Sequence, residues 1–133
     1  MNLKDIEGIG EVFATKLHDQ GVKNVDDLLN KAATPRQRKE LADACGLTEH
    51  KILEWANRAD LYRIKGVGSE YSDLLEACGV DTVVELSTRK PENLIKKMAD
   101  INEAKKLVRQ LPTEEQLRGW VDQAKALPRI LQY

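Results

Sequence analysis

An internal duplication constrains this chain more than any other feature. The segment Ile6-Glu7-Gly8-Ile9-Gly10 recurs 58 residues later as Ile64-Lys65-Gly66-Val67-Gly68. The same offset relates further glycine and apolar residues, which are the pairs Leu17 and Leu75, Gly21 and Gly79, Val22 and Val80, Val25 and Val83, and Leu28 and Leu86. So many matches at one fixed spacing indicate two copies of one structural unit.

The ends of the two copies match at a second offset. Thr48, Trp55 and Ala59 recur 65 residues later as Thr113, Trp120 and Ala124. The second copy is therefore longer by seven residues, or about two helical turns. We expect one repeat over residues 1–60 and the other over residues 61–133.

Both repeats have the signals of short helices rather than strands. Residues 11–20 place apolar side chains at helical spacing, and Gly21 follows as a terminating glycine. Pro35 and Pro91 suit the first turns of later helices, where a proline costs no hydrogen bond. Thr48 and Thr113 are expected N-caps, and Asn102 is expected to cap another short helix. The sequence predicts an all-α fold.

Composition excludes several classes of function. The chain has 21 Lys and Arg against 22 Asp and Glu, so it cannot bind nucleic acid through bulk positive charge. Aromatic residues make up 5%, which argues against a platform that stacks single-stranded bases. No apolar run is long enough to span a membrane, and no signal peptide is visible. We therefore expect a cytoplasmic protein with reduced cysteines and no membrane partner.

The sequence does not predict an enzyme or a metal site. A flap-type nuclease needs several carboxylates that converge on two metal ions, whereas the acidic residues here are spread along helix faces. No nucleophile with a neighbouring base is recognisable. The two histidines and two cysteines have no zinc-ligand spacing.

The Gly-x-Gly segments are the candidate binding sites. Glycine allows the chain to reverse tightly before a helix, and Ile9 or Val67 would anchor the turn in the core. The amides after the second glycine lie at a helix N-terminus, where they are unpaired and attract an anionic oxygen. Such a site suits phosphate above all.

These segments resemble the helix-hairpin-helix motif. The matching residues are Gly8-Ile9-Gly10 with Ala14 and Leu17, and Gly66-Val67-Gly68 with Ser72 and Leu75. The whole chain also resembles a bacterial family of domains of unknown function built from tandem hairpins, sometimes described as similar to flap endonucleases. That likeness is carried by Trp55, Ala59-Asp60-Leu61, Arg63 through Gly68, Tyr71, Trp120 and Ala124-Lys125. It implies a tandem helix-hairpin-helix, SAM-like bundle whose two repeats pack as one compact body.

The resemblance also implies a function. Helix-hairpin-helix modules bind DNA without sequence preference through phosphate contacts, sometimes with a monovalent cation at the hairpin. The implied phosphate contacts are Gly8, Ile9 and Gly10 in one turn and Gly66, Val67 and Gly68 in the other. Lys16 would support the first turn, and Arg63 and Lys65 the second. No other cofactor is implied.

Charge around the turns keeps a second interpretation open. Glu11 follows Gly10, and Ser69 and Glu70 follow Gly68, where a carboxylate favours the helix but repels phosphate. The glycines would then form only tight packing turns, and the chain would be a non-catalytic protein-interaction module. The segment 86–109 favours nucleic acid, because its charged residues are mostly basic: Arg89, Lys90, Lys96, Lys97, Lys105, Lys106 and Arg109 against Glu92, Asp100 and Glu103.

Overall fold

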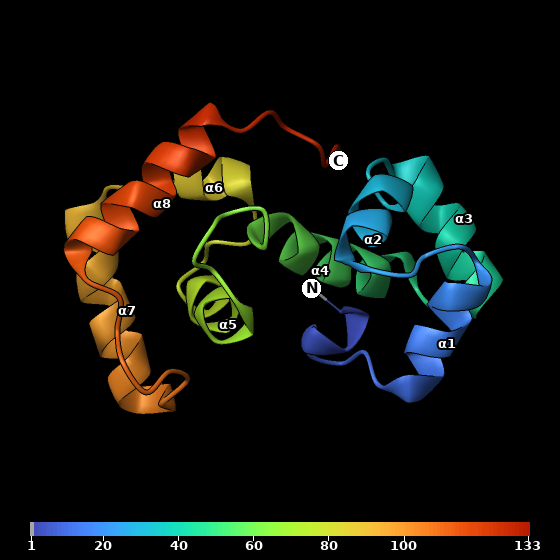
Figure 1. Ribbon diagram of the computed structural model, residues 1–133, viewed down its shortest axis with the longest axis horizontal. Coiled ribbons are helices and arrows are strands. Elements are labelled where there is room, and N and C mark those ends of the chain that lie inside the picture. The colour runs from blue at the N-terminus through green and yellow to red at the C-terminus, as the bar shows by residue number, and fades with distance from the viewer. Residues whose placement is uncertain (1) are drawn as a thin grey trace. The chain divides into compact units, whose positions relative to one another are not determined.

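Every regular element in residues 2–133, the part described by the computed structural model, is a helix. A short 3-10 helix comes first, and eight α-helices follow it (Figure 1). Their bounds are η1 Leu3–Asp5, α1 Glu11–Asp19, α2 Val25–Lys31, α3 Pro35–Cys45, α4 Glu49–Leu61, α5 Ser69–Ala77, α6 Val83–Ser87, α7 Pro91–Lys105 and α8 Glu114–Ala126. The predicted all-α class is confirmed.

The chain divides into two compact units. Unit 1 contains the residues up to Asp60 together with the C-terminal tail, Arg129–Tyr133, and unit 2 is Leu61–Pro128. Each unit has its own core of fully buried side chains. Leu17, Leu28 and Ile52 lie in the first core, and Leu74, Leu86 and Leu117 lie in the second.

The helix ends follow the local signals of the sequence. Pro35 occupies the first turn of α3, and Thr34 caps that helix in a reciprocal capping box with Gln37. Thr113 caps α8 in the same way. The expected cap at Asn102 is wrong, because α7 continues through this residue. The Asn102 side chain instead bonds both backbone groups of Val108, at 3.0 and 3.1 Å, and so holds the chain beyond the end of α7.

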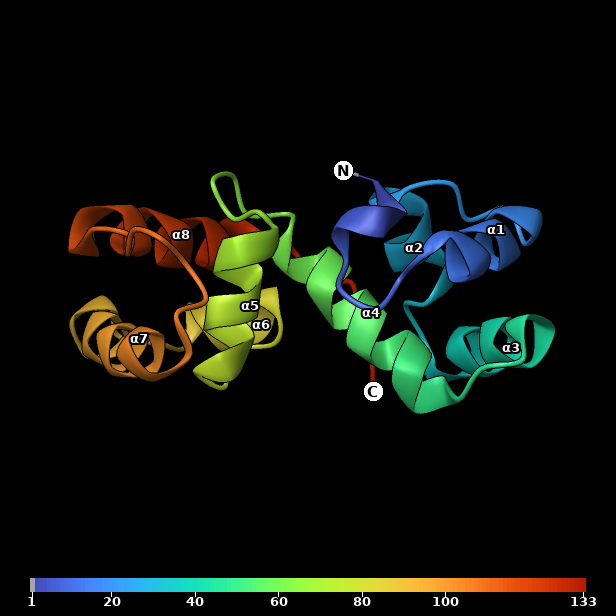
Figure 2. The same cartoon turned by 90° about the horizontal axis from the view of Figure 1, so that it is seen from below.

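The two units contain the same succession of α-helices (Figure 2). Helices α1 and α5 each have nine residues, and α4 and α8 each have thirteen. The net difference of seven residues has three parts. Helix α7 is four residues longer than α3, and the connection after it is five residues longer, while α6 is two residues shorter than α2. In unit 2, α8 lies against α6 and α7, and α5 also contacts α7. These contacts hold the start of α5 on a fixed frame.

The C-terminal tail completes the packing of unit 1. Leu131 is 2% exposed, and the buried guanidinium of Arg38 donates to the carbonyl oxygens of Ala32, at 2.8 Å, and Gln132, at 2.6 Å. The ring of Tyr133 lies 5.7 Å from this guanidinium. Burial lowers the pKa of Arg38 from its usual range, and the nearby Tyr133 opposes that shift. The tail therefore supplies one acceptor, the Gln132 carbonyl, for a charge that unit 1 buries.

Candidate nucleic-acid interface

The two Gly-x-Gly segments fold into matching turns. The first glycine of each has a positive φ, +93° at Gly8 and +98° at Gly66, which a side chain would strain. The middle residue is buried in both turns, as predicted, and its amide donates three residues back. Ile9 bonds the carbonyl of Ile6 at 3.1 Å, and Val67 bonds that of Ile64 at 3.2 Å.

A tryptophan explains why the first glycine of each turn has no room for a side chain. A Cβ on Gly8 would lie 3.3 Å from Nε1 of Trp55, and one on Gly66 would lie 2.9 Å from Nε1 of Trp120. Trp55 is 1% exposed and Trp120 is 5% exposed, so both indoles are core residues. Gly8 and Gly66 are thus required by backbone conformation and by packing together.

The second glycine of each turn has a different role. Gly10 and Gly68 are the N-caps of α1 and α5, with φ of −87° and −101° in the extended region. A Cβ on either would meet no atom within 4 Å among the described residues. Neither glycine has a side chain to bond the first-turn amides, so those N–H groups are open to an external acceptor. This geometry can receive an anionic oxygen.

Acidic residues flank both helix starts, as the sequence indicates. Glu11 forms a salt bridge with Lys4 at 3.4 Å, between two exposed side chains. Glu70 is exposed in the first turn of α5. The Lys4 ammonium offsets the Glu11 carboxylate at the first turn of α1.

The predicted supporting cations lie in different environments. Lys16 is exposed on α1, with its ammonium 5.8 Å from the centre of the Phe13 ring. Arg63 is half-buried, and its guanidinium donates a hydrogen bond to the carbonyl of Pro128. This bond orients the guanidinium toward the segment after α8. Lys65 has an exposed side chain, and Gln123 bonds both its backbone amide, at 2.8 Å, and its carbonyl, at 3.2 Å.

The fold brings two further cations to the turns that the sequence analysis did not assign to them. The Lys51 ammonium lies 5.9 Å from the Trp55 ring centre and 3.8 Å from the Cβ position of Gly8. It also pairs with Glu54 at 3.5 Å. The sequence could have indicated this position of Lys51, because Lys51 and Trp55 are four residues apart on one helix and therefore share a face.

Arg109 is the second of these cations. A shallow recess of about 470 Å³ is lined by Gly66, Gly68, Ser69, Glu70, Tyr71, Arg109 and Gln110. The Tyr71 hydroxyl donates to the carbonyl of Gln110 at 3.1 Å and so ties this loop to α5. One residue of the basic segment 86–109 therefore lines the same recess as the glycines of the second turn.

Metal ligands, cysteines and membrane-spanning helices are the remaining features of residues 2–133 that bear on function. No group of three or more His, Cys, Asp and Glu side chains in that range could hold a metal ion. Burial raises the pKa of the Cys45 and Cys78 thiols, which disfavours the reactive thiolate. None of the described helices is both long enough and apolar enough to cross a membrane.

Comparison with known proteins places the chain in a family. Searches of the curated proteins and of the solved structures found no significant match. A family model described as a domain of unknown function, DUF4332, matches residues 7–127. That match covers both glycine turns, both tryptophans and most of both units, and the chain therefore belongs to the DUF4332 family.

Proposed function

We propose that this chain is a tandem helix-hairpin-helix protein that binds the phosphate backbone of DNA without sequence preference. The binding groups are the first-turn amides of α1 and α5, which follow Gly10 and Gly68. The observation that carries the proposal is the recess in unit 2, which Arg109 lines together with Gly66 and Gly68. Backbone amides and a guanidinium are both good donors to phosphate oxygens.

Arg109 can offset the negative charge of Glu70, which is the feature of the sequence that speaks against phosphate binding at the second turn. Glu70 lines the same recess and repels an anion, but the guanidinium of Arg109 supplies an opposite charge there. The amides then contribute directed hydrogen bonds that do not depend on net charge. Contacts of this kind position a protein on DNA and read no bases, which fits a chain without a basic recognition helix.

The alternative function, a protein-interaction module, has less support. It predicts a contiguous exposed apolar patch. The large apolar side chains found exposed in residues 2–133 are Val12, Val84 and Tyr133, and they lie on three different segments. Separate exposed apolar residues are ordinary on soluble proteins and do not indicate an interface.

The proposal is tested by the anisotropy of labelled double-stranded and single-stranded DNA, titrated with the full chain between 50 and 200 mM salt. Gly10→Val and Gly68→Val place side chains over the amides at positions where there is space and an extended backbone, so we expect both variants to fold. Arg109→Gln removes the cation beside the second turn. Arg118→Gln is its matched control, because Arg118 is exposed on α8 and pairs only locally with Glu114.

We expect salt-sensitive, saturable binding by the natural chain. The double variant with both valines should lose this binding while its helical circular dichroism is unchanged. Arg109→Gln should weaken binding more than Arg118→Gln does. Equal binding by the valine variant, or no binding at 50 mM salt, would overturn the proposal and favour the protein-interaction alternative.

A further inference from the structure

A second recess in unit 2 lies apart from the glycine turn, where α6 is followed by the first turns of α7. It has a volume of about 310 Å³ and is lined by Thr88, Arg89, Lys90, Asn93, Leu94 and Lys97. Three of these six residues are basic, and none is acidic. Lys90 and Lys97 are exposed, so both ammonium groups can reach a ligand.

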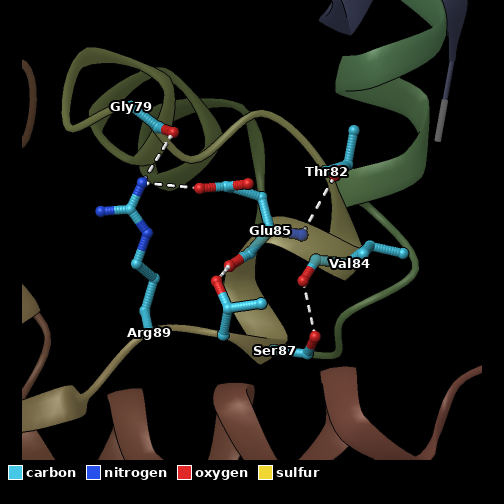
Figure 3. Close-up of polar contacts among 7 residues, drawn as sticks. Gly79, Thr82, Val84, Glu85, Ser87 and Arg89 are labelled. Carbon is cyan, nitrogen blue, oxygen red and sulfur yellow. Dashed lines mark hydrogen bonds and ion pairs between the residues drawn. The ribbon is translucent and has the colours of Figure 1, made fainter.

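Two hydrogen bonds orient the Arg89 guanidinium, and they do not use all of its N–H donors. Its Nη2 donates to Glu85 Oε1 at 2.7 Å and to the carbonyl of Gly79 at 3.1 Å. Figure 3 shows both bonds leaving from this one nitrogen, with the second terminal nitrogen pointing away from Glu85 and Gly79. A guanidinium has five N–H donors, so the two bonds orient Arg89 without using its full capacity.

Two cations of the recess also lie near the Cys78 thiol. Cys78 is fully buried, and its burial raises the pKa of its thiol. The positive charges of Lys97 and Arg89 both oppose that rise. Two of the cations that line the recess therefore act on a single buried side chain.

Unit 1 provides an internal comparison for this recess. Lys31 is the counterpart of Arg89 at the 58-residue offset, and its ammonium likewise donates to a backbone carbonyl at the end of the preceding helix, that of Gln20 at 3.1 Å. The recess beside it, about 260 Å³ in volume, is lined by Gln20, Lys31, Gln37, Glu40, Leu41 and Ala44. It contains one lysine and one glutamate, and that glutamate pairs with Arg36 at 3.2 Å, much as Arg89 pairs with Glu85 in unit 2. Unit 2 therefore differs by the exposed Lys90 and Lys97, since the recess of unit 1 contains no second lysine, and the packing that both units share does not require them.

The residue that precedes the first-turn proline also differs between the two units. Thr34 precedes the first-turn proline of α3 and accepts a hydrogen bond from the amide of Gln37. Lys90 precedes the first-turn proline of α7 and makes no side-chain cap bond. Unit 2 therefore has a lysine where a capping residue would stabilise the helix. The position is better explained by charge than by helix stability.

We infer that the recess formed by Thr88, Arg89, Lys90, Asn93, Leu94 and Lys97 is a phosphate-binding site. Arg89 and the two lysines supply charge, and the Asn93 side chain can donate a hydrogen bond. The positive end of the α7 dipole adds to the attraction, and the exposed carboxylate of Glu92 in the same first turn opposes it. The phosphate can be that of a DNA backbone or of a small phosphate ester. The inference goes beyond the proposed function, since it does not require the glycine turns to bind anything.

The test uses the full chain, labelled with 15N, in two titrations. Inorganic phosphate is added at constant ionic strength in the first, and a short DNA duplex is added in the second. The double variant Lys90→Gln and Lys97→Gln removes two cations of the recess. The matched control, Lys96→Gln with Lys105→Gln, removes two exposed lysines of the same helix that do not line the recess.

We expect saturating amide shifts over residues 88–97 in the natural chain and in the control, and their loss in the recess variant. If DNA is the source, the recess variant also lowers the salt slope of DNA binding by about 1 per lysine relative to the control. Shifts with inorganic phosphate alone would assign the site to a small phosphate ester. Shifts with neither ligand, or equal responses of the two double variants, would overturn the inference. The valine variants at Gly10 and Gly68 separate the proposals, because they should leave the phosphate shifts unchanged.

Discussion

At the scale of single residues, the two glycines of each turn do different work. Gly66 combines a φ of +98° with a Cβ position 2.9 Å from the Trp120 indole nitrogen. Gly68, two residues later, has an extended backbone and open space around it. Only the first is therefore needed for the turn to form, and the second leaves the helix N-terminus uncovered.

This difference predicts unequal costs for two similar substitutions. Gly66→Ala should lower the free energy of unfolding by about 2 kcal/mol, from left-handed backbone strain and contact with the indole. Gly68→Ala should change it by less than about 1 kcal/mol, since glycine is only a modest N-cap. Urea unfolding followed by circular dichroism measures both. Equal losses for the two variants would contradict the separate roles.

The sequence predicts much of the site at this scale and misses what depends on long-range packing. The glycines, the buried Ile9 and Val67 and the core tryptophans follow from local pattern. The positions of Lys51 and Arg109 do not, because both reach the turns from other elements. Arg63 was predicted as a support for the second turn, but its bond to Pro128 depends on a segment 65 residues away.

At the scale of elements, the C-terminal tail acts as part of unit 1. Leu131 is almost fully buried there. The backbone of the neighbouring Gln132 makes two hydrogen bonds: its amide donates to the Ala33 carbonyl at 2.7 Å, and its carbonyl accepts from Arg38. The internal repeat does not predict that the C-terminal tail packs on unit 1, because the first repeat has no equivalent of residues 129–133. Sequence reasoning could place the helices and their caps but not the partner of this segment.

Leu131→Ala should therefore destabilise unit 1 by about 2–3 kcal/mol, the usual cost of truncating a buried leucine. Gln132→Ala is the control and should cost less than about 0.5 kcal/mol, because its side chain is exposed. Hydrogen exchange of α3 amides is the measurement, since the Arg38 side chain and the tail are joined there. Similar exchange in the two variants would show that the tail does not support α3.

At the scale of the whole molecule, the basic and acidic residues of each unit nearly balance. Unit 1 with the tail has 10 basic and 11 acidic residues, and unit 2 has 11 of each. Binding to DNA must then come from a few placed contacts rather than from a broad field. The segment around Arg89, Lys90 and Lys97 is one such local concentration within a neutral unit.

A small number of phosphate contacts predicts a modest dependence on salt. With two to four contacts, the slope of log Kobs against log salt concentration should lie between about −2 and −4. Proteins with broad basic surfaces have steeper slopes, near −10 in the extreme. The anisotropy titrations at 50 to 200 mM salt measure this slope directly. A slope steeper than about −6 would mean that many more cations contact DNA than the two recesses and turns provide.

The pairing of each glycine turn with one tryptophan has an optical consequence. The chain has two tryptophans, and each unit contains one of them in a shielded environment. Replacing either indole with phenylalanine leaves an emission spectrum that belongs to a single unit. Tyr71 lies 5.2 Å from Trp120, whereas Phe13 occupies the comparable place beside Trp55. Tyr133 also lies in unit 1, where its hydroxyl donates to Asn57, so the emission of the remaining indole, rather than energy transfer from tyrosine, reports on a single unit.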